Sequence, residues 1–266
     1  MRFGVNFTGC PHLGLVERMM GEEKIDFCEI MIDNFLGVDV RGIADIFDGR
    51  MVAFHIMRSR FITRPRSEMF MLARRIKTLI EELRPIYVSD HLAVYEEYGR
   101  CLPILAEINY DDYDVVRSRV SEWQELLGQR LLVENFPSVL RHGAAQPNFL
   151  SRLCSEVGSG VLFDASNAVV ANLNMGLPLV AWDGIALSAQ HYHVAGYSSS
   201  GTVPSFTRDT HDQPISRETL LFLSRLAQKS CIATTMTVER DGEHAWDVWL
   251  EDIQRVRDAW NTAKPI

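Results

Sequence analysis

The sequence predicts a (β/α)8 barrel, in which eight parallel strands, each followed by a helix, close into a cylinder. The chain has 266 residues, close to the roughly 250 that this fold uses as one domain. Eight short apolar segments alternate with longer segments of helical periodicity along the whole chain. No linker rich in Pro, Gly or Ser interrupts this alternation, so residues 1–266 are expected to form a single TIM-barrel domain.

The predicted strands are short and rich in Val, Ile, Phe and Tyr, which favour extended backbone. They cover residues 3–8, 27–33, 52–57, 86–92, 131–136, 161–165, 191–196 and 234–239. Strands that alternate with helices pair in parallel through right-handed crossovers. The competing fold is an open doubly wound sheet. Its dinucleotide-binding form is disfavoured because no GxGxxG motif follows the first strand.

The helical segments show one apolar face each. Residues 67–83 place Met71, Ile76, Leu79, Ile80 and Leu83 on one broad face, and residues 113–127, 217–228 and 247–260 follow the same pattern. The segment 196–205, GYSSSGTVPS, lies between the seventh strand and its helix. In a barrel this is the position of an active-site loop.

The composition excludes several classes of protein. The hydrophobic fraction of 47% and charged fraction of 23% are those of an ordinary globular chain. The net charge of −8 repels phosphate backbones, so no nucleic-acid partner is predicted. No apolar run is long enough to span a membrane, and the N-terminus lacks the apolar region of a signal peptide. Five cysteines without a CxxC pair indicate a reducing, cytoplasmic location.

The chain has one dense basic stretch. It contains Arg58, Arg60, Arg64 and Arg66. We interpret it as a solvated loop, and the alternative is a clamp for an acidic peptide or partner.

The ends of consecutive predicted strands carry imidazole, carboxylate and amide side chains. In a TIM barrel these ends converge on the face where active sites lie. A single His in an apolar strand is usually a hydrogen-bonded core residue, but buried charges in such number require partners or metal. The residues concerned are His55, Asp90, His91, Glu134, Asn135, Asp164, Asn167, His191 and His193, Asp209 and His211 in the following loop, and Glu239.

These residue types indicate a multinuclear metal site. Imidazole, carboxylate and amide ligands without Cys suit Fe, Mn or Zn. The donors outnumber the ligands of one tetrahedral zinc, whereas two or three metals sharing a bridging carboxylate would use them all. Glu134, near the middle of the set, is the natural bridge. His191 lies two residues from His193 and is expected to share its strand face, and Glu29 is left either as a base behind the ligands or as a core ion-pair partner.

The order of these motifs resembles the multinuclear non-haem iron-dependent oxidative enzymes, a branch of the xylose-isomerase-like barrels. The matching segments are DFCEIMIDNF, FHI, SDHL, ENF, LFDASN, HVAG, DTH and VER, which span residues 26 to 240. VNFT, EIMIDNFLGV and FHIMRSRFI are similar to the methanobactin biosynthesis (MbnB) branch. The departures from the wider family, Ser166 for Asn, Tyr197 for His and AVY for a segment with Trp, favour the same branch.

The resemblance implies a specific activity. It implies two or three iron ions of mixed Fe(II)/Fe(III) state, with O2 as cosubstrate. The substrate would be the cysteine of a ribosomally made precursor peptide, oxidised to an oxazolone with a neighbouring thioamide, as in methanobactin-type copper chelators. An MbnC-like partner protein would complete a heterodimer. The implied metal ligands are His55, His91, Glu134, Asp164, Asn167, His193, Asp209, His211 and Glu239, and the candidate catalytic carboxylates are Asp90, Asp209 and Glu134.

Two other functions stay open at this point. One is a different metal enzyme on the same barrel. A phosphodiesterase of the endonuclease IV type is disfavoured by the acidic charge, and a sugar isomerase by the absence of Lys at any predicted strand end. The other is a non-catalytic subunit that binds peptide or metal, which predicts gaps in the ligand set.

Overall fold

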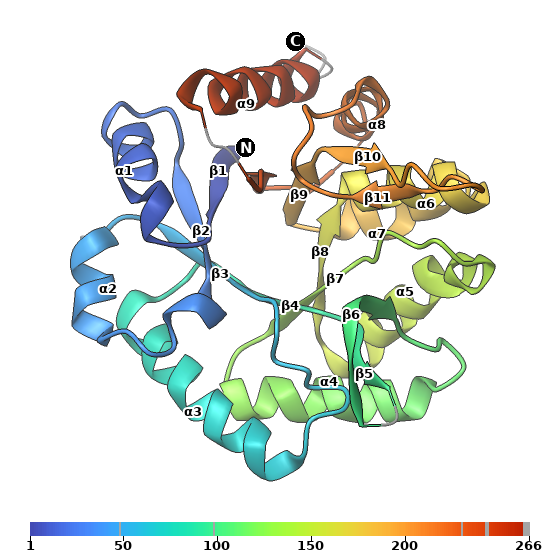
Figure 1. Ribbon diagram of the computed structural model, residues 1–266, viewed down its shortest axis with the longest axis horizontal. Helices are drawn as coiled ribbons and strands as arrows, with labels where there is room; N and C mark the ends of the chain where they lie inside the picture. The colour runs from blue at the N-terminus through green and yellow to red at the C-terminus, as the bar shows by residue number, and fades with distance from the viewer. Residues whose placement is uncertain (48, 98, 230, 243–244, 263–266) are drawn as a thin grey trace.

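The computed structural model describes residues 1–47, 49–97, 99–229, 231–242 and 245–262. Within these residues, eight parallel strands form a closed barrel in the order β1-β12-β9-β8-β7-β4-β3-β2, and helices surround it (Figure 1). The fold predicted from the sequence is therefore confirmed. The strands of the barrel are β1 (Arg2–Phe7), β2 (Phe27–Met31), β3 (Val52–Ile56), β4 (Val88–His91), β7 (Leu131–Glu134), β8 (Gly160–Asp164), β9 (His191–Ala195) and β12 (Thr235–Glu239).

The helices pack their apolar faces on the outside of the barrel. The four helices that the sequence pattern predicted are all present, with ends within one residue of the prediction. The α-helices are α1 (Leu13–Gly21), α2 (Val40–Phe47), α3 (Arg66–Leu83), α4 (Tyr113–Leu127), α5 (Gln146–Val157), α6 (Ala165–Met175), α7 (Asp183–Ser188), α8 (Arg217–Ala227) and α9 (Trp246–Asn261). Short 3-10 turns lie at Cys10–His12, Ile32–Phe35, Arg141–Ala145 and Leu179–Trp182.

Each barrel strand has two buried faces that differ in chemistry. Successive side chains of a strand point to opposite sides. The outward set, such as Phe54, Val133 and Phe163, joins the core shared with the helices. The inward set begins with an apolar layer and continues toward the carboxyl ends of the strands with polar side chains. The apolar layer consists of Phe27, Ala53, Tyr87, Leu132 and Leu162.

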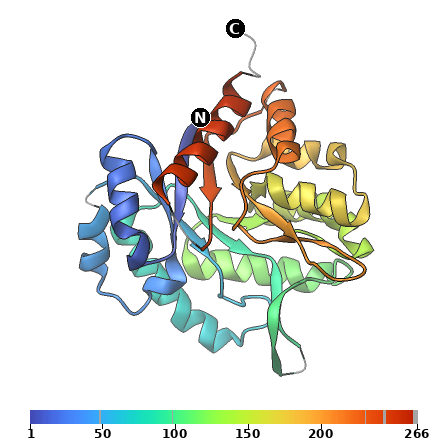
Figure 2. The same ribbon diagram turned by 45° about the horizontal axis from the view of Figure 1, so that its top comes forward.

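Two antiparallel ribbons interrupt the regular alternation. One is formed by β5 (Ala93–Glu97) and β6 (Arg100–Glu107), between β4 and α4, and it extends away from the barrel (Figure 2). The other is formed by β10 (Tyr197–Ser199) and β11 (Thr207–Asp209), between β9 and α8. The sequence pattern predicted a loop at the second position and did not predict the first ribbon. No helix among the described residues is both long and apolar enough to cross a membrane.

Gly196 allows a close backbone approach at the end of β9. A Cβ at this position would lie 1.8 Å from the carbonyl oxygen of Gln213. The Gly196 carbonyl also accepts a hydrogen bond from the His211 backbone N–H at 2.8 Å. Only glycine lets the segment 209–213 fold back against the end of the strand.

The variant Gly196→Ala is expected to lower the melting temperature, because backbone must move to relieve the overlap. Overpacking of this kind costs about 1–3 kcal/mol, and for a chain of this size each kcal/mol lowers Tm by about 2–4 °C. Thermal unfolding followed by circular dichroism measures the change. Gly184→Ala is the matched control, since a Cβ there meets nothing within 4 Å. Equal Tm values for the two variants would contradict the packing argument.

Candidate metal centre

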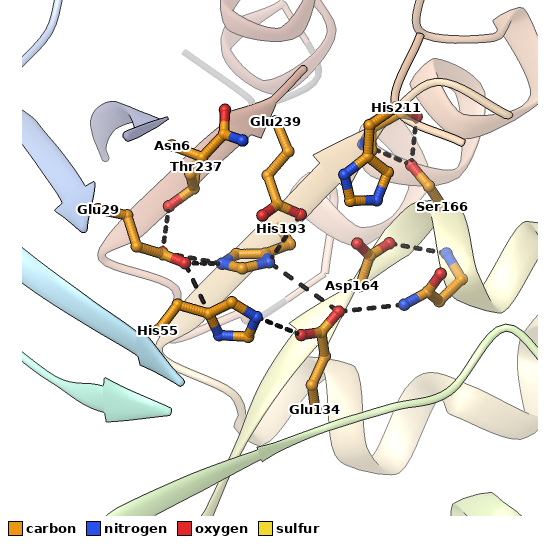
Figure 3. Close-up of polar contacts among 12 residues, drawn as sticks. Asn6, Glu29, His55, Glu134, Asp164, Ser166, His193, His211, Thr237 and Glu239 are labelled. Carbon is orange, nitrogen blue, oxygen red and sulfur yellow. Dashed lines mark hydrogen bonds and ion pairs between the residues drawn. The ribbon is translucent and has the colours of Figure 1, made fainter. Parts of the chain in front are cut away.

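A buried group of acidic and imidazole side chains fills the barrel at the carboxyl ends of its strands (Figure 3). Three triplets in it each bring their ligand atoms within 4.8 Å of one another. Imidazole and carboxylate are the donors that such metal sites use. The inner cluster consists of Glu29, His55, His91, Glu134, Asp164, His193 and Glu239.

Glu134 lies at the centre of the inner cluster. Its Oε2 is 3.4 Å from His55 Nε2 and 3.4 Å from His91 Nε2. Its Oε1 is 3.1 Å from Asn167 Nδ2 and 4.0 Å from His193 Nδ1. Ligands that bind one ion at about 2.0–2.2 Å lie about 3–3.5 Å from each other. The spacing of Glu134 from both imidazoles is therefore that of atoms around a shared cation.

His193 is held between two carboxylates. Its Nε2 lies 2.8 Å from Glu29, and its Nδ1 lies 3.0 Å from Glu239 Oε2. Glu29 is fixed in turn by the hydroxyl of Thr237, which donates to its Oε2 at 2.8 Å, and by the hydroxyl of Tyr87. Glu29 thus orients the His193 ring so that Nδ1 faces the centre of the inner cluster.

Asp164 and Asn167 reach the cluster through the start of α6. Asp164 is the N-cap residue, and its Oδ1 accepts a hydrogen bond from the Asn167 backbone N–H at 2.7 Å. An Asp at this position satisfies one of the free N–H groups of the first helical turn. The sequence DASN therefore builds a cap and leaves Asp164 Oδ2 and the Asn167 amide next to Glu134.

Asp209 is the last residue of β11, and His211 follows it by two residues; we call these two residues the mouth pair. His211 Nε2 lies 2.7 Å from Asp209 Oδ2, and its Nδ1 lies 3.6 Å from Asp241 Oδ2. The backbone of His211 has a left-handed φ of 54°, and its carbonyl accepts from the Asp241 N–H at 2.9 Å. Both residues line a cavity of about 180 Å³ together with His55, His91, Glu134, Glu239, Asp241 and four uncharged residues.

Several buried oxygens around Glu134 lack a hydrogen-bond donor. Buried polar atoms are otherwise nearly always satisfied, so orphaned acceptors call for an explanation. Carboxylate and amide oxygens without donors are available to bind cations. These atoms are Glu134 Oε2, Asp164 Oδ2, Asn167 Oδ1 and Asp209 Oδ1. The donor set therefore fits bound metal.

Burial keeps two imidazoles neutral. Burial, with smaller contributions from His91 and His193, lowers the pKa of His55 well below its usual value. Burial likewise lowers the pKa of His91 to about 4. Both rings therefore carry a free lone pair at neutral pH, which is the form that binds metal.

Burial has the opposite effect on the pKa of the carboxyl groups. Burial raises the pKa of Glu134 well above its usual value. Burial, with Asp209 and Glu239 adding to it, raises the pKa of Asp164 to about 7. Burial opposes the charged form of Glu239 as well, but His193 and His211 outweigh it and lower that pKa. The site therefore favours the protonated form of Glu134 and Asp164, whereas Glu239 is stabilised as a carboxylate.

Three residues at the strand ends do not enter the inner cluster. Asp90 lies on the opposite face of β4 from His91, where its Oδ2 accepts from Trp123 Nε1 at 2.8 Å and its Oδ1 from the His91 N–H at 2.8 Å. The Asn135 side chain ties the β7 end to the backbone of Asp164, since its Nδ2 donates to the Asp164 carbonyl and its Oδ1 accepts from the Asp164 N–H. His191 points inward, as its spacing from His193 predicted, but it lies nearer the apolar layer, against Tyr87.

Ser166 and Tyr197, two residues that differ from the wider family, each form hydrogen bonds through their side chains. Ser166 Oγ donates to the Ala195 carbonyl at 2.8 Å and accepts from the Ala195 N–H at 2.9 Å, so it joins α6 to β9. The Tyr197 hydroxyl donates to Ser216 Oγ at 2.8 Å. Both side chains are therefore engaged by the barrel wall and α8.

Sequence reasoning left Glu29 unassigned and did not single out Tyr87 or Asp241. For Glu29 a signal was present, because a lone carboxylate inside the apolar strand FCEIM must face a partner. Tyr87 and Asp241 carried no comparable signal. Their contacts with Glu29 and His211 join segments that are far apart in the chain.

The fold and the inner cluster together define a TIM-barrel protein with a buried site suited to metal ions. Comparison with known proteins gives the family. The chain belongs to the MbnB/TglH/ChrH family of RiPP precursor modification enzymes, whose family model matches residues 4–261. RiPPs are ribosomally made, modified peptides, and the resemblance seen in the sequence motifs is thereby confirmed.

The chain is also similar to curated proteins of the UPF0276 group. A UPF0276 protein of Rhizorhabdus wittichii is 29% identical over 94% of this chain and 92% of its own length. Another, from Acaryochloris marina, is 33% identical over 53% of this chain and 52% of its own length. The first match covers nearly the whole of both chains, and the second covers about half of each.

Solved structures share the fold. A xylose isomerase-like TIM-barrel protein from Mycobacterium smegmatis, in complex with magnesium, has a TM-score of 0.67 and 13% identity, covering 98% of this chain and 97% of its own. Endonuclease IV from Thermus thermophilus has a TM-score of 0.60 and 15% identity, covering 98% of this chain and 100% of its own. At this identity the likeness concerns the fold alone.

The variant Glu29→Gln is expected to weaken metal binding without unfolding the protein. An amide can still accept from Thr237, but it no longer holds His193 by charge. Loss of such an orienting partner typically costs about 10–100-fold in metal affinity. Titration of the apoprotein with Mn²⁺, followed by calorimetry, measures the change. Glu17→Gln, an exposed change on α1, is the control, and equal affinities for both variants would contradict the orienting role.

Proposed function

We propose that this chain is an iron- and O2-dependent oxidase that modifies a cysteine of a ribosomally made precursor peptide together with a smaller, MbnC-like partner protein. The family assignment supports a peptide substrate. The observation that carries the metal part is Glu134, buried between two neutral imidazoles with one oxygen that accepts no hydrogen bond. A single carboxylate in this setting is suited to bridge two cations.

The residues that would hold iron fall into an inner and an outer group. The inner donors are His55, His91, Glu134, Asp164, Asn167, His193 and Glu239. Asp209 and His211 stand at the mouth and would complete the coordination on the side where peptide arrives. Bound iron would supply redox chemistry toward O2 and a site for a cysteine thiolate.

The protein itself would orient the reactants and control protons. The apolar layer under the inner cluster and the outer core keep water from the buried face. Asp209, paired with His211 at the open side, is placed to take a proton from an arriving thiol. Glu134 is the proposed bridge. Asp90 is proposed to act indirectly, since it holds the His91 backbone and Trp123 from the other face of β4.

The other metal enzymes considered from the sequence have less support. A sugar isomerase of this barrel would need a Lys in the site, and none of the described residues lining the cavity is a lysine. A non-catalytic subunit predicts gaps in the donor set, whereas the inner donors contact one another and the mouth pair lines the same cavity.

Protein from iron-supplemented cells is expected to contain two or three irons per chain, and Glu134→Gln is expected to lose at least one of them. A carboxylate that bridges two metal ions helps to bind both of them, so its replacement weakens both sites. Metal analysis with Mössbauer and EPR spectroscopy measures this, and O2 consumption with a cysteine-containing precursor peptide and the partner protein measures activity. Glu17→Gln, an exposed change, is the control.

The outcomes of this experiment separate the proposals. A mixed-valent signal with peptide-dependent O2 uptake supports the oxidase. Stoichiometric zinc or manganese that iron cannot replace would overturn the iron assignment and favour hydrolase or isomerase chemistry. A chain that binds no metal would overturn the metal centre itself.

Metal binding is expected to tighten as pH rises from 6 to 8. Asp164, with a pKa of about 7, and Glu134, with a raised pKa, hold protons that metal must displace. Each displaced proton changes the apparent Kd about tenfold per pH unit below the ligand's pKa. His55 and His91, whose pKa values are lowered, do not compete in this range. Mn²⁺ calorimetry in buffers of different ionisation enthalpy counts the protons. Binding without proton release at pH 6 would contradict this.

A further inference from the structure

A second cavity of about 720 Å³ adjoins the metal centre on its open side. Its walls include β6, the segment after β7 and the segment 206–210, so the two antiparallel ribbons of Figure 1 both contribute. Five of its residues also line the smaller cavity over the inner cluster, so the two spaces are continuous. The shared residues are Met57, His91, Leu105, Asp209 and Thr210.

The lining of this groove is apolar along part of its length. Val139 and Phe206 keep 40% and 37% of their surface exposed, although both are large hydrophobic residues. Leu102, Leu105 and Phe136 continue the same lining toward the metal centre. Exposed apolar surface next to a polar site is typical of a ligand-binding groove.

The charged side chains of the outer groove are cationic. Arg58, Arg60 and Arg208 line it, and its acidic residue, Asp209, belongs to the mouth pair. This contrasts with the whole chain, whose net charge is −8. The groove is therefore complementary to an acidic ligand, although the net charge of the chain is negative.

Among the described residues, Arg58 and Arg208 form no close ion pair, whereas the other three arginines of the basic stretch each form one. Arg60 pairs with Glu96 at 3.9 Å, Arg64 with Glu68 at 3.4 Å and Arg66 with Glu122 at 2.7 Å. Within the described part of the chain, the guanidinium groups of Arg58 and Arg208 form no ion pair and no hydrogen bond, and the acidic groups that they influence are the more distant Asp33 and Asp212. The solvated-loop interpretation thus suits Arg64 and Arg66, but Arg58 remains available to a ligand.

We propose that this groove binds the extended segment of the precursor peptide next to the modified cysteine, and that Arg58 and Arg208 select a peptide with an Asp or Glu in that segment. The inference rests on the proposed function for the identity of the peptide. A guanidinium binds carboxylate through paired, charge-assisted hydrogen bonds. The apolar lining would contact the peptide side chains next to that Asp or Glu. His91 and Asp209, which line both cavities, would place the cysteine at the metal centre.

The test is a binding measurement with synthetic peptides. The probe is the fluorescein-labelled peptide Ala-Leu-Asp-Ala-Cys-Ala, and its partner carries Asn in place of Asp. Fluorescence anisotropy with the full-length apoprotein is expected to show binding of the Asp peptide about 5–10-fold tighter than the Asn peptide. The preference is expected to shrink as salt is raised, because the groove is open to solvent.

The double variant Arg58→Gln with Arg208→Gln is expected to bind both peptides equally. Arg74→Gln, an exposed arginine on α3 outside the groove, is the matched control and is expected to keep the preference. A preference that survives in the double variant would overturn the assignment of these two arginines. Failure of either peptide to bind at up to about 1 mM would overturn the groove as this chain's own peptide site.

The same measurement separates this inference from the proposed function. Peptide binding is read without metal, O2 or turnover. An Asp preference that depends on Arg58 and Arg208, in a protein that consumes no O2, would support the groove and contradict the oxidase. O2 consumption by a protein that binds the Asp and Asn peptides equally would support the oxidase and contradict the groove.

Discussion

The structure depends most on one constraint, which is the burial of several carboxylates inside a barrel that supplies few donors to satisfy them. Glu134, Asp164 and Glu239 are nearly inaccessible to solvent. Imidazoles lie next to Glu134 and Glu239, and Asp164 accepts a hydrogen bond from the Asn167 backbone N–H. Burying anions at this density is costly unless cations or protons accompany them. Burial raises the pKa of Glu134 and of Asp164, which favours the protonated form of both carboxyl groups. Bound metal ions would replace those protons, so folding, protonation and metal binding are coupled here.

The barrel and most of the inner cluster could be predicted from the sequence because both follow from short-range patterns. Eight apolar segments with regular spacing indicate the barrel, and a barrel brings the ends of its strands to one place. His55, His91, Glu134 and His193 lie at those ends, and the alternation of strand side chains aims them inward. Family membership was readable for the same reason, since the motifs at the strand ends are those that the fold brings together.

Other features required the three-dimensional structure. Asp90 and His91 are adjacent in the sequence, and only the register of β4 decides that His91 faces inward while Asp90 meets Trp123. The residues of the β5–β6 ribbon do not alternate strongly between apolar and polar, as those of a half-buried strand would. The ribbon is also an addition to the eight strand–helix units that the sequence pattern indicates. Tyr87 and Asp241 act through contacts with residues more than 25 positions away, so no local spacing could indicate them.

The site combines a rigid inner part with a more exposed outer part, and this division suits a peptide substrate. The inner donors stand on barrel strands or on the first turn of α6, where hydrogen bonds such as those of Glu29 and Asp164 fix their orientation. Asp209 and His211 stand on a connection that Gly196 and Asp241 hold against the barrel. The arginines and exposed apolar residues lie further out, on the segments that differ from a regular barrel. Chemistry common to a family would then reside in the barrel, while the choice of peptide would reside in the ribbons and loops around it.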